Sequence, residues 1–178
     1  GDIEYQDHPY IKTPNLNQMA AEGLRFDRFY AAAPVCSPTR ASLLTGTHPN
    51  RMGCFSFGYP IKPEESTIAD ILKKEGYKTA HFGKWHIGKI NKESPENPGN
   101  FGFDYWLTAS NFFDLDPLLS RNGTIERLKG EGSEVLVNEA IDFIKSAEKE
   151  GKPYFIVIWF SAPHTPHIPL KKHRRPYA

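Results

Sequence analysis

Cysteine, arginine, lysine and histidine side chains occur along this sequence at spacings suited to handling a small anion. Cys36 stands just before a predicted helix, and Arg40 follows it by one helical turn. Free N–H groups at a helix start favour negative charge nearby, and an arginine one turn on can steady that charge. Lys84, His86 and His164 come later in the chain. Such a set is typical of a nucleophile surrounded by cations and a proton-transfer group.

Each of these residues also has a plainer interpretation. Cys36 could be a small buried thiol, or it could pair with Cys54 in a disulfide. A cysteine-phosphatase loop is excluded, because it needs a longer segment between its cysteine and arginine. Taken alone, Lys84 would be a surface lysine and His86 a hydrogen-bonded loop histidine.

A second histidine, His167, lies three positions after His164 and suggests a metal-binding pair. Pro163 and Pro166 prevent the helix that would align the two imidazoles. We therefore interpret His164 as the functional residue and assign His167 to a substrate cleft at most.

Hydrophobic periodicity predicts the elements that must position these residues. Capping residues, apolar spacing and glycine stops predict helices over 14–22, 39–45, 67–75 and 133–149. The buried faces expected for the last two helices contain Ile68, Ile71 and Leu72, and Val137, Ala140, Ile141 and Ile144. Short apolar or alternating runs predict strands over 24–31, 77–82, 104–109 and 154–160, and Asn122-Gly123-Thr124 is a turn.

The alternation of helices and strands predicts an α/β fold with a mostly parallel central sheet flanked by helices. The 154–160 run is apolar on both faces, as expected for a covered strand. In such sheets, ligand-binding groups gather at the carboxyl ends of the strands. Cys36, Lys84 with His86, and His164 each follow a predicted strand, so we expect three strand ends to converge on one site.

The bulk composition is that of a soluble globular protein, with 39% hydrophobic and 24% charged residues in 178 positions. A net charge of +1 argues against nucleic acid as a partner, and no apolar run approaches the length of a membrane span. The basic run 171–175 is interpreted as a solvated loop, with a polyanion contact as the alternative. No signal peptide is present in this segment, and the ends at Gly1 and Ala178 look cut.

Two segments carry a family resemblance. Residues 36–46, CSPTRASLLTG, resemble the first signature of the type I sulfatases, C-x-P-S/T-R-x-x-x-L-T-G. Residues 76–88, GYKTAHFGKWHIG, resemble the second, G-Y-x-T-x-x-x-G-K-W-H-x-G, at every fixed position. Segments 13–16 and 162–166 are also similar to sulfatases, in the same order. The likeness covers nearly the whole chain and implies the alkaline phosphatase-like fold, in incomplete form.

The resemblance implies a specific chemistry. In sulfatases a separate maturation enzyme oxidises the motif cysteine, here Cys36, to formylglycine. The hydrated aldehyde attacks sulfur and then expels sulfate. By the same resemblance, Arg40 and His86 would hold the diol, and Lys84 would bind sulfate oxygens. His164 would contact the sulfate and protonate the leaving oxygen.

The resemblance also implies features outside these motifs. Ser110 or Asn111 could match a polar group near the sulfate, although the alignment there is loose. Family members bind one divalent cation, usually Ca²⁺, through oxygen ligands. The formylglycine at Cys36 would be one ligand, and the two acidic pairs that supply the others are absent from this sequence. Asp2 resembles the stretch after the first pair and is not itself assigned as a ligand.

The chain is therefore interpreted as a partial sulfatase catalytic domain over residues 1–178, lacking the first strand and the C-terminal part, and inactive by itself. A sulfated polysaccharide is the expected substrate, with Phe55, Phe57 and Tyr59 forming either a sugar-stacking rim or part of the core. Family habit places the protein in the periplasm or outside the cell. The alternatives are a phosphonate or phosphate monoester hydrolase of the same superfamily, a non-catalytic sugar-binding relative, and a purely structural α/β domain.

Overall fold

A computed structural model describes residues 3–177 and divides the chain into two compact units. The larger unit comprises residues 32–168 and contains all the predicted site residues. The smaller unit combines the segment before residue 32 with the segment after residue 168. Asp2 lies outside the described residues.

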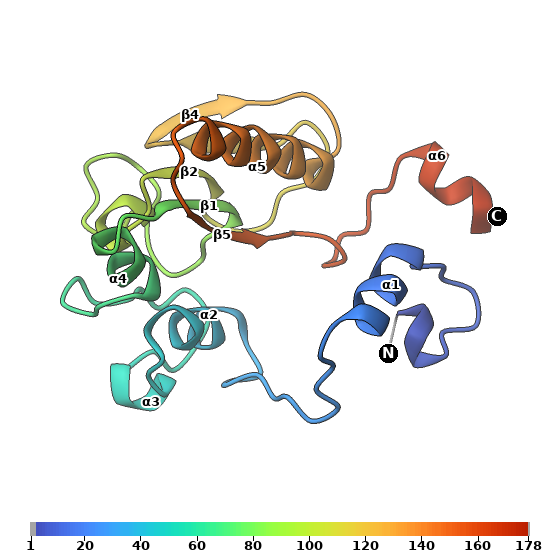
Figure 1. The fold of residues 1–178 in the computed structure, drawn as a ribbon, viewed down its shortest axis with the longest axis horizontal. Coiled ribbons are helices and arrows are strands. Elements are labelled where there is room, and N and C mark those ends of the chain that lie inside the picture. The colour runs from blue at the N-terminus through green and yellow to red at the C-terminus, as the bar shows by residue number, and fades with distance from the viewer. Residues whose placement is uncertain (1–2, 178) are drawn as a thin grey trace. The chain divides into compact units, whose positions relative to one another are not determined.

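The larger unit is built on one five-stranded sheet in the order β4-β3-β2-β1-β5 (Figure 1). Its strands are β1 (Lys78–Lys84), β2 (Tyr105–Ala109), β3 (Leu118–Arg121), β4 (Thr124–Arg127) and β5 (Tyr154–Trp159). Strand β1 pairs in parallel with both β2 and β5. Strand β3 pairs antiparallel with β2 on one side and with β4 on the other. The predicted α/β class and the largely parallel sheet are confirmed.

Helices cover both faces of this sheet, as Figure 1 shows. Helix α5 (Gly132–Lys149) lies on one face, where Leu136, Ala140 and Phe143 pack with Phe82 of β1. On the other face a second core joins residues of α2 (Cys36–Thr45), α3 (Pro49–Met52), α4 (Ile68–Lys74) and the 3₁₀ turn η2 (Pro98–Phe101). The sheet is thus held between two separate hydrophobic cores, which fixes where its strand ends lie.

Local sequence explains where these helices begin and end. Helix α4 opens with a capping box, in which Thr67 Oγ1 accepts from Asp70 N while the Asp70 carboxylate accepts from Thr67 N. Helix α2 ends at Gly46, whose φ of 67° suits a residue without a side chain.

The predicted buried faces of two helices are only partly correct. In α5, Ala140 is buried as predicted, but the rest of the buried stripe contains Leu136 and Phe143, while Val137 and Ile141 are exposed. This stripe carries the bulkier side chains, and they fill the space above β1 and β2. In α4 the small Ala69 is buried and the two isoleucines, Ile68 and Ile71, face outward. Because alanine is small, neighbouring segments of the protein can pack close to α4 on that side.

The strand predictions need three further corrections. Residues 24–31 form no strand, and Leu24 and Phe29 are exposed, because the alternating pattern finds no pairing partner among residues 3–177. Strand β5 forms as predicted but lies at the sheet edge and is only partly covered, since β1 is its one neighbour among the described strands. The β3–β4 hairpin was not predicted, although Asn122-Gly123 does form its turn.

The smaller unit is described by its own contacts. It contains η1 (Glu4–Gln6), α1 (Pro14–Glu22), α6 (Lys171–Arg174) and η3 (Arg175–Tyr177). Helix α1 matches the prediction and carries Pro14 at its first turn. The Glu4 carboxylate accepts from Lys12 Nζ and from the backbone N–H of Thr13, which ties the first turn to the start of α1. The basic run forms exposed helical turns instead of a loop.

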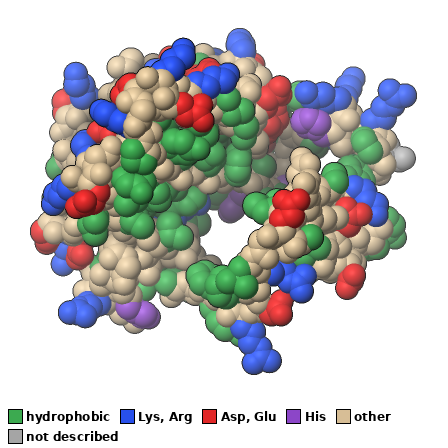
Figure 2. Space-filling view, viewed as in Figure 1, with side chains coloured by type: hydrophobic (Ala, Val, Ile, Leu, Met, Phe, Trp, Pro, Cys, Tyr) green, Lys and Arg blue, Asp and Glu red, His purple; other side chains and the backbone are tan. Residues whose placement is uncertain are grey.

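The surface carries both charge signs. Lysine, arginine and acidic side chains lie side by side along the margins of the visible face of the larger unit, and hydrophobic side chains occupy its middle (Figure 2); the mixture of signs is in keeping with a net charge of +1. Within residues 3–177, no helix combines the length and the apolar character needed to cross a bilayer.

Candidate active site

The N-terminus of α2 presents Cys36. The preceding Val35 is extended and offers no side-chain cap to the helix, so Cys36 is the first helical residue. The predicted helix therefore begins three positions earlier than residue 39. The thiol is free and half-buried, and Cys54 is also free, so the disulfide interpretation is wrong. An uncapped ten-residue helix start beside Cys36 favours negative charge there.

Strand β1 delivers Lys84 to the same point. The lysine is the last residue of the strand and is only 1% exposed. Its Nζ donates to Cys36 Sγ at 3.5 Å. Burial lowers the pKa of Lys84, and the nearby Cys36 opposes that shift. Gly83 makes this approach possible, because a Cβ there would lie 2.1 Å from Trp159 O at a φ of +94°.

Arg40 reaches the site from the second turn of α2. Its Nη1 donates to the backbone oxygen of Lys84 at 2.9 Å, which connects the helix to the end of β1. Its Cζ lies 4.6 Å from the centre of the Trp159 ring. Burial lowers the pKa of Arg40, and Cys36 partly offsets that effect. The guanidinium remains cationic near neutral pH, so two cations flank Cys36.

His86 follows β1 in a left-handed backbone conformation, with φ of 57°. Its carbonyl oxygen accepts from Ser37 Oγ, which in turn accepts from Gly58 N at 2.7 Å. Burial, followed by the positive charges of Lys84 and Arg40, lowers the pKa of His86 to about 4. Its buried Nδ1 has no hydrogen-bond partner among residues 3–177. A neutral imidazole with a free nitrogen can accept a proton at neutral pH.

His164 comes from the loop after β5. It is exposed, and its Nδ1 donates to the carbonyl of Thr165 at 2.7 Å, which leaves Nε2 as the other ring nitrogen. The His164 ring stacks on Phe112 with centroids 3.6 Å apart. Lys84 Nζ lies 3.6 Å from the centre of the same Phe112 ring. Phe112 thus brings His164 into the cluster and lies in contact with both groups.

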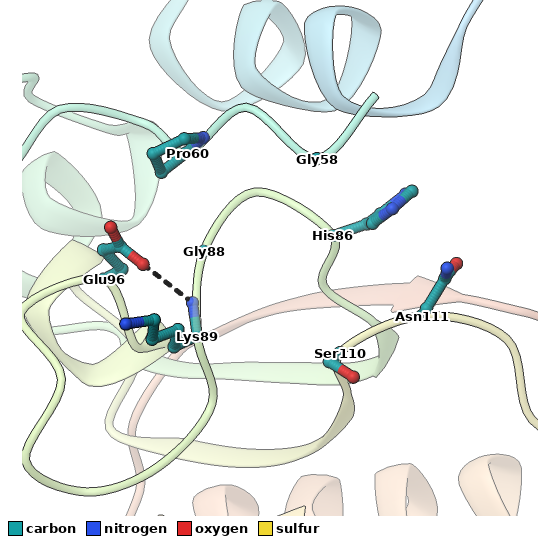
Figure 3. Close-up of a pocket in the computed structure, with 8 residues that line it drawn as sticks. All are labelled: Gly58, Pro60, His86, Gly88, Lys89, Glu96, Ser110 and Asn111. Atoms are coloured by element: carbon teal, nitrogen blue, oxygen red, sulfur yellow. Dashed lines mark hydrogen bonds between the residues drawn. The ribbon is translucent and has the colours of Figure 1, made fainter. Parts of the chain in front are cut away.

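Ser110 and Asn111 follow β2 and line a neighbouring cavity of about 440 Å³, with His86 and Gly58 on its other sides (Figure 3). In the close-up, Asn111 extends toward His86, and Glu96 accepts from Lys89 N across the far end. Cys36 lines a different, smaller cavity with Arg40 and Trp159. The structure therefore places Ser110 beside His86, and no contact of Ser110 with Cys36 is seen.

The exposed aromatic residues near this cavity are not part of the core. Phe55, Phe57 and Tyr59 are 63%, 67% and 46% exposed, so the core interpretation of this loop is wrong. Gly58 and Pro60 of the same loop line the cavity of Figure 3.

Three strand ends do converge, but one differs from the prediction. The ends of β1 and β5 supply Lys84, His86 and the His164 loop as expected. The third is the end of β2, because residues 24–31 are not a strand. Phe112, Trp159 and Ser37 were not assigned a role from the sequence. An apolar residue at a strand end and a motif serine carry no signal that separates a site residue from a core residue.

The described residues do not form a metal site of their own. Within residues 3–177, no three histidine, cysteine, aspartate or glutamate side chains gather as a cation would need. Cys36 has lysine and arginine neighbours, which suit an anion and do not complete a calcium shell.

Comparisons with known proteins show the family of this chain. The sulfatase family model matches residues 1–177. The ulvan-active sulfatase of Formosa agariphila is 34% identical over 169 residues, covering 93% of this chain and 33% of that enzyme. The chain thus spans about a third of the length of this curated relative.

Two solved structures share the fold. The crystal structure of Ps i-CgsB superposes with a TM-score of 0.87 at 25% identity, covering 98% of this chain and 45% of that one. A protein solved in complex with its substrate D-glucosamine-2-N,6-O-disulfate superposes with a TM-score of 0.83 at 29% identity, covering 96% of this chain and 33% of that one.

Proposed function

This chain belongs to the sulfatase family, and on that premise we propose that it contributes the nucleophile and the sulfate-binding cations of a sulfuric ester hydrolase. The observation that carries the proposal is the 3.5 Å approach of Lys84 Nζ to Cys36 Sγ, at the start of α2 and the end of β1. Two elements held by separate cores meet there, so the contact is set by the fold.

The nucleophile in this proposal is residue 36 after oxidation of Cys36 to formylglycine by a maturation enzyme. The hydrated aldehyde supplies one hydroxyl to attack sulfur and a second whose deprotonation releases sulfate. Lys84 binds the sulfate oxygens and the charge that develops on them, and Arg40 holds the diol and adds positive charge beside the sulfate. His86 is neutral at pH 7, with a pKa of about 4, and accepts a proton from the diol.

His164 serves as the general acid in this scheme. Its Nδ1 is held by the Thr165 carbonyl, so Nε2 is the nitrogen available to the leaving oxygen. The alcohol leaves as a neutral species when that proton is transferred. Stacking on Phe112 orients the His164 ring toward the Lys84 side of the site.

The proposal includes a divalent cation, Ca²⁺ by family habit, and assigns it one ligand in this chain, residue 36. Once oxidised, residue 36 would offer oxygen atoms of the kind that Ca²⁺ prefers. Residues 3–177 gather no further cluster of ligands, so no step of the reaction is assigned to the metal.

The proposed substrate is a sulfated sugar, possessing a sulfate monoester on a saccharide hydroxyl. Support comes from the named relatives, one active on ulvan and one bound to a disulfated glucosamine. The cavity beside His86 offers hydroxyl, amide and carboxylate groups from Ser110, Asn111 and Glu96, and these suit sugar hydroxyls.

The test combines peptide mass spectrometry with kinetics on the full-length protein from its native host. We expect an aldehyde at position 36, turnover of an aryl sulfate faster than of an aryl phosphonate, and loss of turnover in Cys36→Ala. Cys54→Ala is the matched control. Cys54 is a buried thiol whose pKa is raised by burial, and within residues 3–177 the one hydrogen bond of its Sγ goes to the Tyr59 carbonyl. An unmodified thiol in an active enzyme would overturn the mechanism, and faster phosphonate turnover would overturn the substrate class.

A further inference from the structure

Trp159 is the last residue of β5 and lies against the guanidinium of Arg40. The Arg40 Cζ is 4.6 Å from the indole centre, well inside the range of a cation–π contact. Both residues line the small cavity that also contains Cys36. The indole therefore forms part of the cavity wall and packs against the arginine of the site.

Arg40 has few other restraints. Its Nη1 donates to the Lys84 carbonyl, and its buried Nε has no hydrogen-bond partner among residues 3–177. No carboxylate in the described part of the chain forms an ion pair with it. One hydrogen bond leaves a planar group free to rotate, so the indole face is the second restraint on its orientation.

Trp159 is itself held in place. Its ring packs edge-on against His81 at 4.9 Å and is stacked near Trp85 at 6.4 Å. His81 is fully buried, and its Nδ1 lies 3.0 Å from Thr108 Oγ1 on β2. The indole is thus held by residues of β1 and of the loop that follows it, and it contacts Arg40 as well.

An aromatic face suits this position for an electrostatic reason. A carboxylate in contact with Arg40 would fix the guanidinium equally well but would cancel the charge needed by an anionic substrate. An indole attracts the cation through its ring quadrupole and leaves the N–H donors and the positive charge available.

We propose that Trp159 is a positioning residue for Arg40, which holds the guanidinium plane toward residue 36 without neutralising it. The inference rests on the proposed function for its kinetic consequence, whereas its structural content stands on the contacts of Arg40 alone. Trp159 acts through Arg40, so its loss should lower the rate of the chemical step more than substrate binding.

The kinetic test compares Trp159→Leu, Trp159→Phe and the control Trp106→Leu in the full-length, matured protein. Trp106 is a tryptophan of β2 in the same sheet, buried to 8% exposure and packed near Gly99. We expect Trp159→Leu to lower kcat about tenfold with little change in KM, and Trp159→Phe to recover most of it. Trp106→Leu should lower thermal stability without this kcat-specific loss.

A spectroscopic test does not require turnover. In arginine-labelled protein, the Arg40 Nε–H proton is identified by its loss in Arg40→Lys. We expect its signal upfield, because Nε is bonded to the Cζ that lies over the Trp159 ring, 4.6 Å from its centre. The upfield shift should persist in Trp106→Leu and disappear in Trp159→Leu.

An Arg40 signal without a ring-current shift in the unsubstituted protein would overturn the inference, as would equal kcat losses in Trp159→Leu and Trp106→Leu. An upfield Arg40 signal in a protein that cleaves no sulfate ester would support the positioning contact and reject the proposed function. The two failures are therefore distinguishable.

Discussion

The end of β1 and the loop after β5 supply the site in two different ways. At the end of β1, Lys84 is 1% exposed and Gly83 touches the backbone of β5. In the loop after β5, His164 is exposed, and its ring is held by Phe112 and the Thr165 carbonyl. One region positions its groups through the sheet and two hydrophobic cores, and the other through a few surface contacts.

In the proposed function, this difference separates the groups that bind charge from the group that transfers a proton to the leaving alcohol. The attraction between a cation and an anion is stronger where water is excluded, so burial suits the proposed roles of Lys84 and Arg40. A general acid for a sugar alcohol must meet a bulky leaving group at the surface, so an exposed histidine suits that role. The comparison predicts that a change that separates the β1–β5 pairing, as at Gly83, affects folding and chemistry together. Replacing the buried charge of Lys84, or a side chain in the exposed loop, should affect chemistry without a loss of stability.

The largest effect is expected from Gly83→Ala. A Cβ would meet Trp159 O at 2.1 Å, so the β1–β5 pairing must separate, at a cost of more than about 3 kcal/mol in the free energy of unfolding. Gly76→Ala is the matched control, because its φ of +85° is similar and nothing lies within 4 Å, and about 1 kcal/mol is expected. Urea unfolding of the full-length variants measures both. Equal losses would show that backbone conformation alone matters.

Lys84→Met should affect chemistry strongly and stability weakly. Removing a buried ammonium beside residue 36 should lower kcat by about 10²–10³-fold, because charge on the sulfate oxygens loses a partner. The thermal midpoint should stay level or rise, since burying a lysine charge is costly and methionine fills a similar volume. Aryl sulfate kinetics and calorimetry on the same samples test this. Unchanged kcat would remove Lys84 from the site.

His164→Asn should lower kcat by about 10²-fold and leave the thermal midpoint unchanged, because the side chain is exposed. The loss should shrink for aryl sulfates with acidic leaving groups, which need no proton. A uniform loss across leaving groups would contradict the general-acid role. His167→Asn, also exposed and in the same loop, is the control for general disturbance of the segment.

The smallest effect concerns the pH dependence of stability, and it should originate in the buried histidines. Burial, followed by the positive charge of Arg40, lowers the pKa of His81 from 6.5 to about 3. Between those values the unfolded chain binds a proton that the folded chain does not, so stability falls as pH drops from 6.5 toward 3. The slope is at most about 1.4 kcal/mol per pH unit from this group. His86, with a pKa of about 4, acts in the same direction.

Urea unfolding at about pH 7 and about pH 5 measures this slope. In His81→Gln the fall should be smaller than in the unsubstituted protein. An identical fall in both proteins would assign the pH dependence to other groups.

The site residues that were predicted from the sequence share one property: each can be recognised from the spacing of residues within a short segment. Cys36 and Arg40 are one helical turn apart, and Lys84 and His86 lie at the end of a strand and just after it, so a pattern within one segment suffices. Trp159 and Phe112 contact partners far away in the sequence, and an apolar residue at a strand end looks the same whether it packs in a core or against a guanidinium. Such contacts depend on strand order, which the sequence did not specify.

The fold errors have a similar origin. Residues 24–31 alternate as a strand does, but a strand also needs a neighbour, and none is present among residues 3–177. Helix α5 carries two overlapping apolar stripes, and the one with Leu136 and Phe143 is buried because it fits the sheet. Periodicity predicted the helix correctly and could not choose its face.

The left-handed backbone at His86 has a consequence for how this protein tolerates change. A residue with a side chain at φ of 57° costs about 1–2 kcal/mol relative to glycine, which adopts that conformation freely. His86→Gly should therefore relieve strain and also remove the imidazole that serves as proton acceptor in the proposed reaction. Selection for thermal stability alone would reward the loss of this side chain, so a stabilisation campaign should screen for turnover alongside melting temperature.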